Sequence, residues 1–78
     1  MQQFPLFSQV ILTKNLPQFG FLKGDVTIVV EYVEPSGYIL EVFDNEGDTL
    51  DVIPVSESEI SFPKPHTVVN YREYASIP

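Results

Sequence analysis

The side chains that could do acid–base chemistry in this chain are few. Glu31 and Glu41 are expected on neighbouring strands, and two carboxylates can act as acid and base when their environments differ. No serine, lysine or histidine joins them, so we interpret both as part of a solvent-facing surface. His66 stands alone near two prolines, and Ser56 and Ser58 lack the glycines of a nucleophile elbow. We therefore expect no catalytic residue and no enzyme.

Acidic side chains also gather around one predicted turn. Carboxylate oxygens are the ligands that Ca²⁺ and Mg²⁺ prefer, but the glycine spacing is not that of an EF-hand. We favour a solvated acidic turn over a weak cation site for the residues concerned, which are Asp44, Glu46, Asp48 and Asp51. The chain has no cysteine and one histidine, so we expect no transition metal and no cofactor.

Length and charge restrict what the chain can bind. Its 78 residues allow one small domain. The net charge is −7 and the four cations are scattered, so we expect no nucleic-acid binding. A basic protein partner suits this charge, although acidity alone also keeps a protein soluble. No apolar stretch approaches the roughly 20 residues of a membrane span, and residues 1–8 lack the basic start of a secretory signal. We expect a cytoplasmic protein with no membrane partner.

Runs of β-branched and aromatic residues, separated by turn residues, predict three strands between residues 26 and 55. The turns are expected at residues 34–37 and 44–48. A first strand over 9–13, an ordered loop over 14–23, a serine-capped helical turn over 56–60 and a short strand over 60–62 complete the pattern. The pattern predicts an all-β fold, a small five-stranded SH3-like barrel over residues 1–62.

Successive residues of the predicted strand that begins at Val26 point to opposite faces. The face expected to line the core is wholly apolar and consists of Val26, Ile28, Val30 and Tyr32. Tyr38 is expected in the same core. The opposite face then exposes Val29, Ile39 and Phe43, which need a cover.

Residues 63–78 are expected to form a C-terminal tail beyond a proline boundary. Val68, Val69, Tyr71 and Tyr74 fit one side of a short helix, and an extended docking strand fits them as well. The aromatic residues exceed what one small barrel can hide. Either the tail covers the second face of the sheet, or the face marks an interface. We predict that partner-binding residues are Val29, Ile39, Phe43, Tyr71 and Tyr74.

Two motifs in the chain resemble a family of short bacterial proteins that is catalogued as a domain of unknown function. Residues 15–26 read NLPQFGFLKGDV and follow its "LP…G…GDV" opening, and residues 44–49 read DNEGDT and follow its "D-x-x-G-x-T" loop. The resemblance covers about residues 8–62. Thr27 stands where the family usually has a glycine, and the tail has no counterpart.

The resemblance implies an SH3-like barrel with no known catalytic site. Members are often encoded beside a small protein that looks like a toxin-related domain, which implies a toxin–antitoxin or immunity pair. We therefore expect a non-catalytic protein–protein interaction module, the antitoxin- or immunity-like partner of that protein. The alternative is a self-associating or accessory structural subunit. The chain lacks the ALYDY motif and the tryptophan of a proline-peptide groove.

Overall fold

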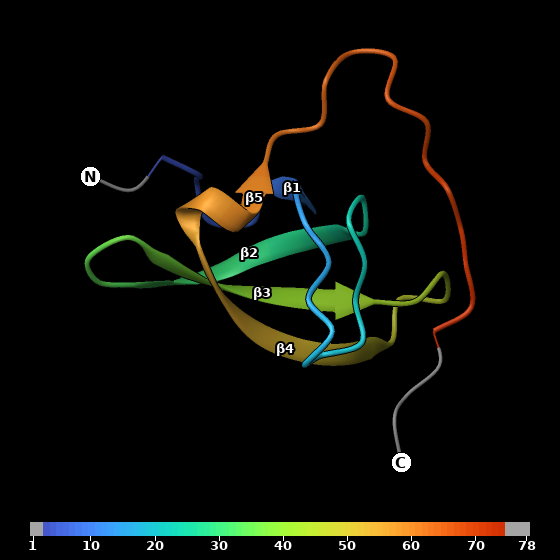
Figure 1. Ribbon diagram of the computed structural model, residues 1–78, viewed down its shortest axis with the longest axis horizontal. Coiled ribbons are helices and arrows are strands. Elements are labelled where there is room, and N and C mark those ends of the chain that lie inside the picture. The colour runs from blue at the N-terminus through green and yellow to red at the C-terminus, as the bar shows by residue number, and fades with distance from the viewer. Residues whose placement is uncertain (1–2, 75–78) are drawn as a thin grey trace.

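The computed structural model describes residues 3–74 and shows one antiparallel sheet (Figure 1). Its strands are β1 (Gln9–Leu12), β2 (Val26–Val33), β3 (Gly37–Phe43), β4 (Thr49–Ser56) and β5 (Ile60–Ser61). A 3₁₀ turn, η1 (Glu57–Glu59), stands where the sequence predicted a helical turn. The described residues contain no helix with the length and apolar content that crossing a membrane requires. The prediction of an all-β protein is confirmed.

The sheet is a row of strands in the order β4-β3-β2-β1-β5. A barrel closed by hydrogen bonds needs a ladder between its first and last strands. In residues 3–74, β4 and β5 are not paired with each other, and η1 carries the chain between them. The last strand is two residues long, and Pro63 follows closely and cannot donate to a ladder.

The β1–β2 loop covers one face of the sheet and closes the core (Figure 1). Its Leu16 and Phe21 are buried, and the Leu16 N–H donates to the Phe21 carbonyl at 2.8 Å. The core consists of Phe4, Val10, Leu12, Leu16, Phe21, Val29, Tyr38, Leu40, Val42, Ile53, Val55 and Ile60. The loop is therefore the second wall of a core that the sheet cannot enclose alone.

Strand β2 buries the face opposite to the one that its sequence predicted. Thr27 and Val29 are fully buried because they lie across from Val10 and Leu40, which are themselves in the core. The Thr27 hydroxyl donates to the Val10 carbonyl at 3.3 Å, so this buried polar group is satisfied. The residues expected in the core are instead half-buried or, for one, exposed: Val26, Ile28, Val30 and Tyr32. A bulge between Val29 and Glu31 shifts the alternation beyond it.

The "LP…GDV" motif builds the β1–β2 loop. The Asn15 side-chain oxygen accepts the Lys23 N–H at 2.8 Å, and a carboxylate oxygen of Asp25 accepts the Leu22 N–H at 2.8 Å. Gly24 has a φ of +93°, a left-handed conformation that glycine adopts without strain. These motif residues hold the loop over the core.

The "D-x-x-G-x-T" motif builds the β3–β4 turn in a similar way. One carboxylate oxygen of Asp44 accepts the N–H groups of Glu46 and Asp48, both at 2.9 Å. Gly47 takes a φ of +88°. The motif therefore specifies the turn, because a short acceptor side chain and a left-handed residue are what the turn requires.

The buried hydroxyl of Tyr38 joins three segments that are distant in sequence. It donates to a carboxylate oxygen of Glu57 at 2.7 Å and accepts the N–H groups of Gln3 at 2.9 Å and Phe4 at 3.3 Å. Burial and the Glu57 carboxylate raise the pKa of Tyr38 above its ordinary value. The hydroxyl fixes the N-terminal segment and η1 against β3.

Replacing Tyr38 by phenylalanine should lower the free energy of unfolding by about 1.5–3 kcal/mol, because a hydrogen bond to a charged group is lost. Urea unfolding followed by circular dichroism measures this change. Tyr32→Phe is the matched control, since the Tyr32 hydroxyl has no hydrogen-bond partner among residues 3–74 and the side chain is 37% exposed. Equal unfolding free energies for the two variants would contradict the assigned role.

The free energy of unfolding should also fall as the pH rises above about 10, where an ordinary tyrosine titrates. The native state holds the Tyr38 proton more tightly than the unfolded chain does. This contribution is therefore complete below the unfolded pKa and is lost as the pH rises through the folded one. The difference in stability between the wild type and Tyr38→Phe should shrink above about pH 10 in urea titrations. A difference that stays constant with pH would contradict this linkage.

Candidate functional site

The face of the sheet that points away from the core carries apolar side chains next to carboxylates. We call it the outer face and define it by Ile28, Glu31, Ile39, Glu41, Phe43, Val52 and Pro54. The strand register places Ile28, Glu41 and Val52 in one row across the sheet. Val52 is 52% exposed, and Phe43 is also exposed. An apolar strip crosses β2, β3 and β4, with Glu41 in this row and Glu31 in the row of Ile39 and Pro54.

The structure separates the five predicted partner-binding residues. Ile39 and Phe43 lie on the outer face, where Ile39 is half-buried. Val29 was expected on the same surface, but it is fully buried because the register turns it toward Leu40. Tyr71 is 77% exposed on the tail, and Tyr74 is half-buried against the core. Two of the five therefore belong to the outer face.

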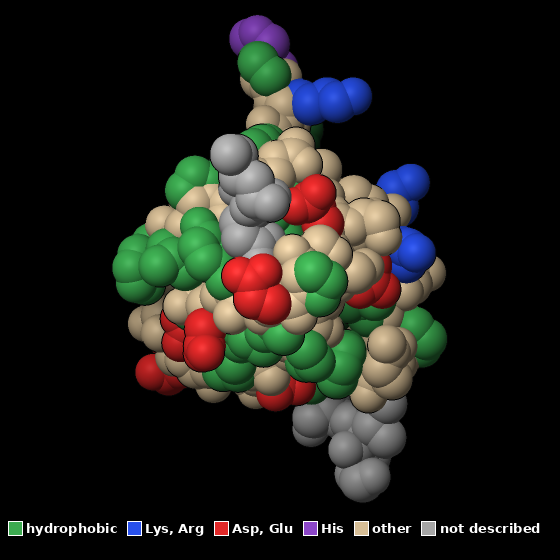
Figure 2. All heavy atoms as spheres, turned by 90° about the vertical axis from the view of Figure 1, so that its left-hand side faces the viewer, with side chains coloured by type: hydrophobic (Ala, Val, Ile, Leu, Met, Phe, Trp, Pro, Cys, Tyr) green, Lys and Arg blue, Asp and Glu red, His purple; other side chains and the backbone are tan. Residues whose placement is uncertain are grey.

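The charge on the surface is mostly negative. Figure 2 shows the side of the molecule at the left of Figure 1, with carboxylates between hydrophobic patches and basic side chains toward its upper and right margins. Of the cations, Arg72 is engaged in an ion pair with Asp25. The apolar strip therefore belongs to a molecule whose net charge of −7 favours a positively charged partner.

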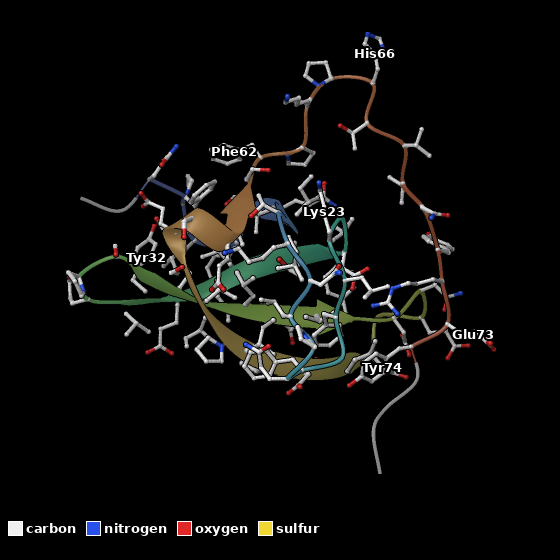
Figure 3. All side chains as sticks on the ribbon, in the orientation of Figure 1. Lys23, Tyr32, Phe62, His66, Glu73 and Tyr74 are labelled. Carbon is white, nitrogen blue, oxygen red and sulfur yellow. The ribbon has the colours of Figure 1, made fainter. Side chains whose placement is uncertain are left out.

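The tail leaves the body after β5, arches outward and returns to the β1–β2 loop (Figures 1 and 3). Figure 3 shows His66 at the apex of the arch, pointing away from the body. The sequence left a short helix or a docking strand open for the tail. Its described part, residues 63–74, forms neither, and residues 75–78 lie outside the described part.

The returning end of the tail is held by a bidentate ion pair and a ring stack. The Arg72 guanidinium donates to both carboxylate oxygens of Asp25, at 3.0 and 2.5 Å. The Tyr74 ring stacks on Phe21 with 5.0 Å between centroids, and its hydroxyl donates to the Phe19 carbonyl at 3.4 Å. The tail therefore docks on the loop. It does not lie along the centre of the outer face.

A hollow of about 680 Å³ separates tail residues 69–74 from the adjacent end of the sheet. Val26 and Phe43 contribute the sheet side of this hollow, and Tyr71 contributes the tail side. The tail thus borders the outer face at one end.

The two glutamates of the candidate acid–base pair share the outer face in neighbouring rows. Glu31 lies opposite Ile39 and Glu41 lies opposite Ile28, so the two glutamates are not cross-strand partners. The Glu41 carboxylate accepts the Thr49 hydroxyl at 2.5 Å, which commits one of its oxygens to the β3–β4 hairpin.

The acidic turn brings three of its four predicted residues together. Oxygens of Asp44, Glu46 and Asp48 lie within 4.8 Å of one another, while Asp51 is outside the group. One Asp44 oxygen already accepts two backbone N–H groups. These hydrogen bonds account for the position of the Asp44 carboxylate at the turn.

The remaining nucleophile and base candidates lie apart. Ser56 and Ser58 contact each other through their hydroxyls at 3.1 Å, and the Ser56 N–H donates to Glu59 at 2.9 Å. This arrangement caps η1. His66 is on the arch, in a left-handed conformation that closes a turn between Lys64 and Thr67.

Sequence reasoning missed Val52, Pro54 and Phe7. The outward positions of Val52 and Pro54 follow from the alternation of β4 once Ile53 and Val55 are known to be buried. The sequence pattern could therefore have indicated both residues. Phe7 has a φ of 65° and is 73% exposed, and its N–H donates to the Val29 carbonyl at 2.6 Å. No local pattern indicates a left-handed aromatic residue.

Removing the ion pair should release the tail and leave the sheet almost unchanged. Arg72→Ala is expected to lower the {¹H}–¹⁵N heteronuclear NOE of residues 66–74, which reports motion on the ps–ns timescale. The free energy of unfolding should change by less than about 1 kcal/mol, because the pair is partly solvated. Lys64→Ala is the control, since the Lys64 side chain has no partner within residues 3–74. An unchanged NOE in Arg72→Ala would show that the guanidinium does not hold the tail.

Comparison with known proteins places this chain in a family. No curated protein and no solved structure matches it. Residues 6–62 match the family described as Domain of unknown function (DUF4926). The match contains both motifs and all five strands, and it ends where the tail begins. The chain therefore belongs to the DUF4926 family, through the sheet and the loop that closes its core.

Proposed function

We propose that this chain is a non-catalytic module that binds a protein partner through its outer face. The observation that carries the proposal is the apolar strip at Ile39, Phe43 and Val52, with Glu31 and Glu41 among its residues. Exposed apolar surface accompanied by polar groups on a small protein typically contacts another protein. No assembled group of acid, base and nucleophile among the described residues competes with this interpretation.

The partner is proposed to be basic. The net charge of −7 and the acids within the strip favour a positively charged surface, which also accelerates encounter. The sequence motifs resemble proteins encoded beside a toxin-like protein. We therefore propose that toxin-like protein as the partner, with this chain as its antitoxin- or immunity-like counterpart in the cytoplasm.

Phe7 supports an interaction role independently of charge. A non-glycine residue with left-handed backbone is strained, and such residues occur where the surrounding structure holds them for a function. The Phe7 N–H bond to the Val29 carbonyl holds this one, and the ring remains 73% exposed. An exposed aromatic ring fixed in this way suits an interface, in which aromatic residues are enriched.

The proposal includes an SH3-like barrel as the scaffold. It is supported by the strand order, by the long core-covering loop between β1 and β2 and by the 3₁₀ turn before β5. The barrel would be completed by side-chain packing between the two edges of the sheet, with Val55 of β4 and Ile60 of β5 in one core.

A second candidate function is self-association through the same face. The apolar strip favours it, as it favours any protein contact. In a symmetric dimer, however, both copies would bring Glu31 and Glu41 to the interface. Like charges across an interface are unfavourable, so a basic partner fits the face better than a copy does.

Co-expression with the protein encoded beside this chain, followed by gel filtration, tests the proposal. The two proteins should co-elute, and Val52→Asp should weaken binding at least about tenfold, because a charge enters the apolar strip. Val68→Asp is the matched control, since Val68 is 82% exposed on the arch and away from the outer face.

Two outcomes would overturn this assignment. Separate elution of the wild-type proteins would reject the partner, and equal losses for Val52→Asp and Val68→Asp would reject the outer face. Sedimentation of the isolated chain decides the alternative, because a dimer that Val52→Asp dissociates would establish self-association.

A further inference from the structure

Some backbone groups of β4 point away from β3, toward the free edge of the sheet. Among residues 3–74 only β3 pairs with β4, so within this part of the chain one edge of β4 is free. The Glu57 N–H donates to the Ser36 carbonyl at 3.1 Å and continues the β3–β4 ladder. In an antiparallel ladder alternate residues point their backbone groups inward. Asp51, Ile53 and Val55 therefore face β3, and Val52, Pro54 and Ser56 face away. The register shift between Val42 and Phe43 ends this alternation before Thr49.

None of these three outward positions offers a free donor. The Val52 N–H donates to the Asp51 carboxylate at 2.8 Å, and the Ser56 N–H donates to the Glu59 carboxylate at 2.9 Å. Pro54 has no N–H. The carbonyls of Val52 and Pro54 point the same way and have no hydrogen-bond partner among residues 3–74. From Val52 to Ser56 the free edge of β4 therefore presents acceptors only.

An acceptor-only edge selects its ligand. A partner strand adds to a sheet by exchanging donors and acceptors with it, and this edge cannot supply donors. Lysine and arginine side chains are donors only, so they match what the edge presents. The edge is thus closed to strand addition and remains open to a basic side chain.

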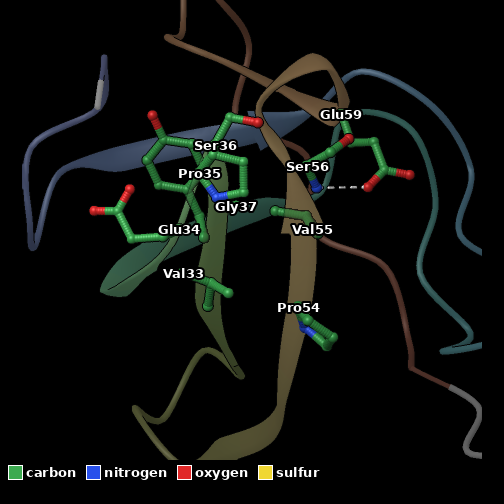
Figure 4. Close-up of a pocket in the computed structure, with 10 residues that line it drawn as sticks. Val33, Glu34, Pro35, Ser36, Gly37, Pro54, Val55, Ser56 and Glu59 are labelled. Atoms are coloured by element: carbon green, nitrogen blue, oxygen red, sulfur yellow. Dashed lines mark hydrogen bonds between the residues drawn. The ribbon is translucent and has the colours of Figure 1, made fainter. Parts of the chain in front are cut away.

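A shallow hollow of about 320 Å³ lies at this edge, between the β2–β3 turn and β4 (Figure 4). Its apolar wall includes Val33, Pro35 and Pro54. Figure 4 shows Glu34 and Glu59 on opposite sides of it. No lysine or arginine lines it. The volume is near the lower end for ligand sites, which suits one long side chain.

We infer that this hollow binds an arginine or lysine side chain of the protein partner. The inference rests on the proposed function and adds the chemistry of one contact to it. The methylene stem packs on the proline-lined wall, as the stems of long basic side chains do. The charged head meets the two carboxylates and the free carbonyl of Pro54, which accept charge-assisted hydrogen bonds. Pro54 belongs to both surfaces, so the hollow continues the outer face.

Titration of the ¹⁵N-labelled full chain with N-acetyl-arginine methylamide tests the hollow without the partner. Amide shifts should concentrate in residues 33–37 and 54–59. N-acetyl-citrulline methylamide, a neutral analogue of the same shape, should cause much smaller shifts. Glu34→Gln combined with Glu59→Gln should weaken arginine binding about fivefold, the effect of losing two exposed charge contacts. Glutamine at 59 retains an acceptor for the Ser56 N–H, so the cap of η1 is kept.

Glu46→Gln is the matched control, because it removes one charge from the acidic β3–β4 turn outside the hollow. An absence of shifts with the arginine probe would overturn the inference. Equal shifts from the citrulline analogue, shifts centred on residues 44–48, or an equal loss of binding in Glu46→Gln would overturn it as well.

The co-elution experiment separates failure of the hollow from failure of the proposed function. The double glutamine variant should weaken partner binding, and Glu46→Gln should not. Partner binding that survives the double variant but is lost in Val52→Asp would reject the hollow and retain the outer face. Separate elution of the wild-type proteins would reject the proposed function. The arginine titration tests the hollow independently of the partner.

Discussion

The Tyr38 hydroxyl is the constraint on which the ends of this fold depend. A buried hydroxyl must find partners, and this one meets a carboxylate from η1 and two backbone N–H groups from the N-terminal segment. Phe4 is thereby placed against the Tyr38 ring at 5.4 Å and the Phe62 ring at 4.7 Å between centroids. The N-terminal segment, the centre of the sheet and η1 share one polar atom.

The structure explains what the residues of the two family motifs do in the fold. Asn15, Gly24 and Asp25 hold the loop that walls the core, and Asp44 and Gly47 shape the β3–β4 turn. Each residue is accounted for by a backbone hydrogen bond or a left-handed conformation. The sequence signature of the family is therefore a description of how the chain folds, and the outer face that we propose as the partner-binding surface lies outside both motifs.

Local sequence signals predicted much of this fold. Strand positions, the two turns and the helical turn before β5 follow from β-branched runs, glycines and capping residues, which act over a few positions. The core face of β2 did not follow, because Thr27 is polar and its burial depends on Val10 in another strand. Ile39 and Phe43 were placed on the outer face by alternation within β3.

Two other features were beyond single-sequence reasoning. The docking of Arg72 on Asp25 spans 47 positions, and no periodicity records such a contact. The blocked edge of β4 depends on the register with β3 and on side chains that reach back to their own backbone. Both features depend on how the strands and the tail pack in the folded chain, which local sequence patterns do not reveal.

The arch between β5 and Arg72 is fastened at both ends and makes few contacts between them. The entropy of closing such a segment grows only logarithmically with its length, by about 0.6 kcal/mol for each doubling. Extra residues near His66 would therefore lengthen a span that is already clear of the body (Figure 3). This apex is the natural attachment point for an affinity tag or a fluorophore, because a reporter there leaves the sheet, the loop and both ends of the arch as they are.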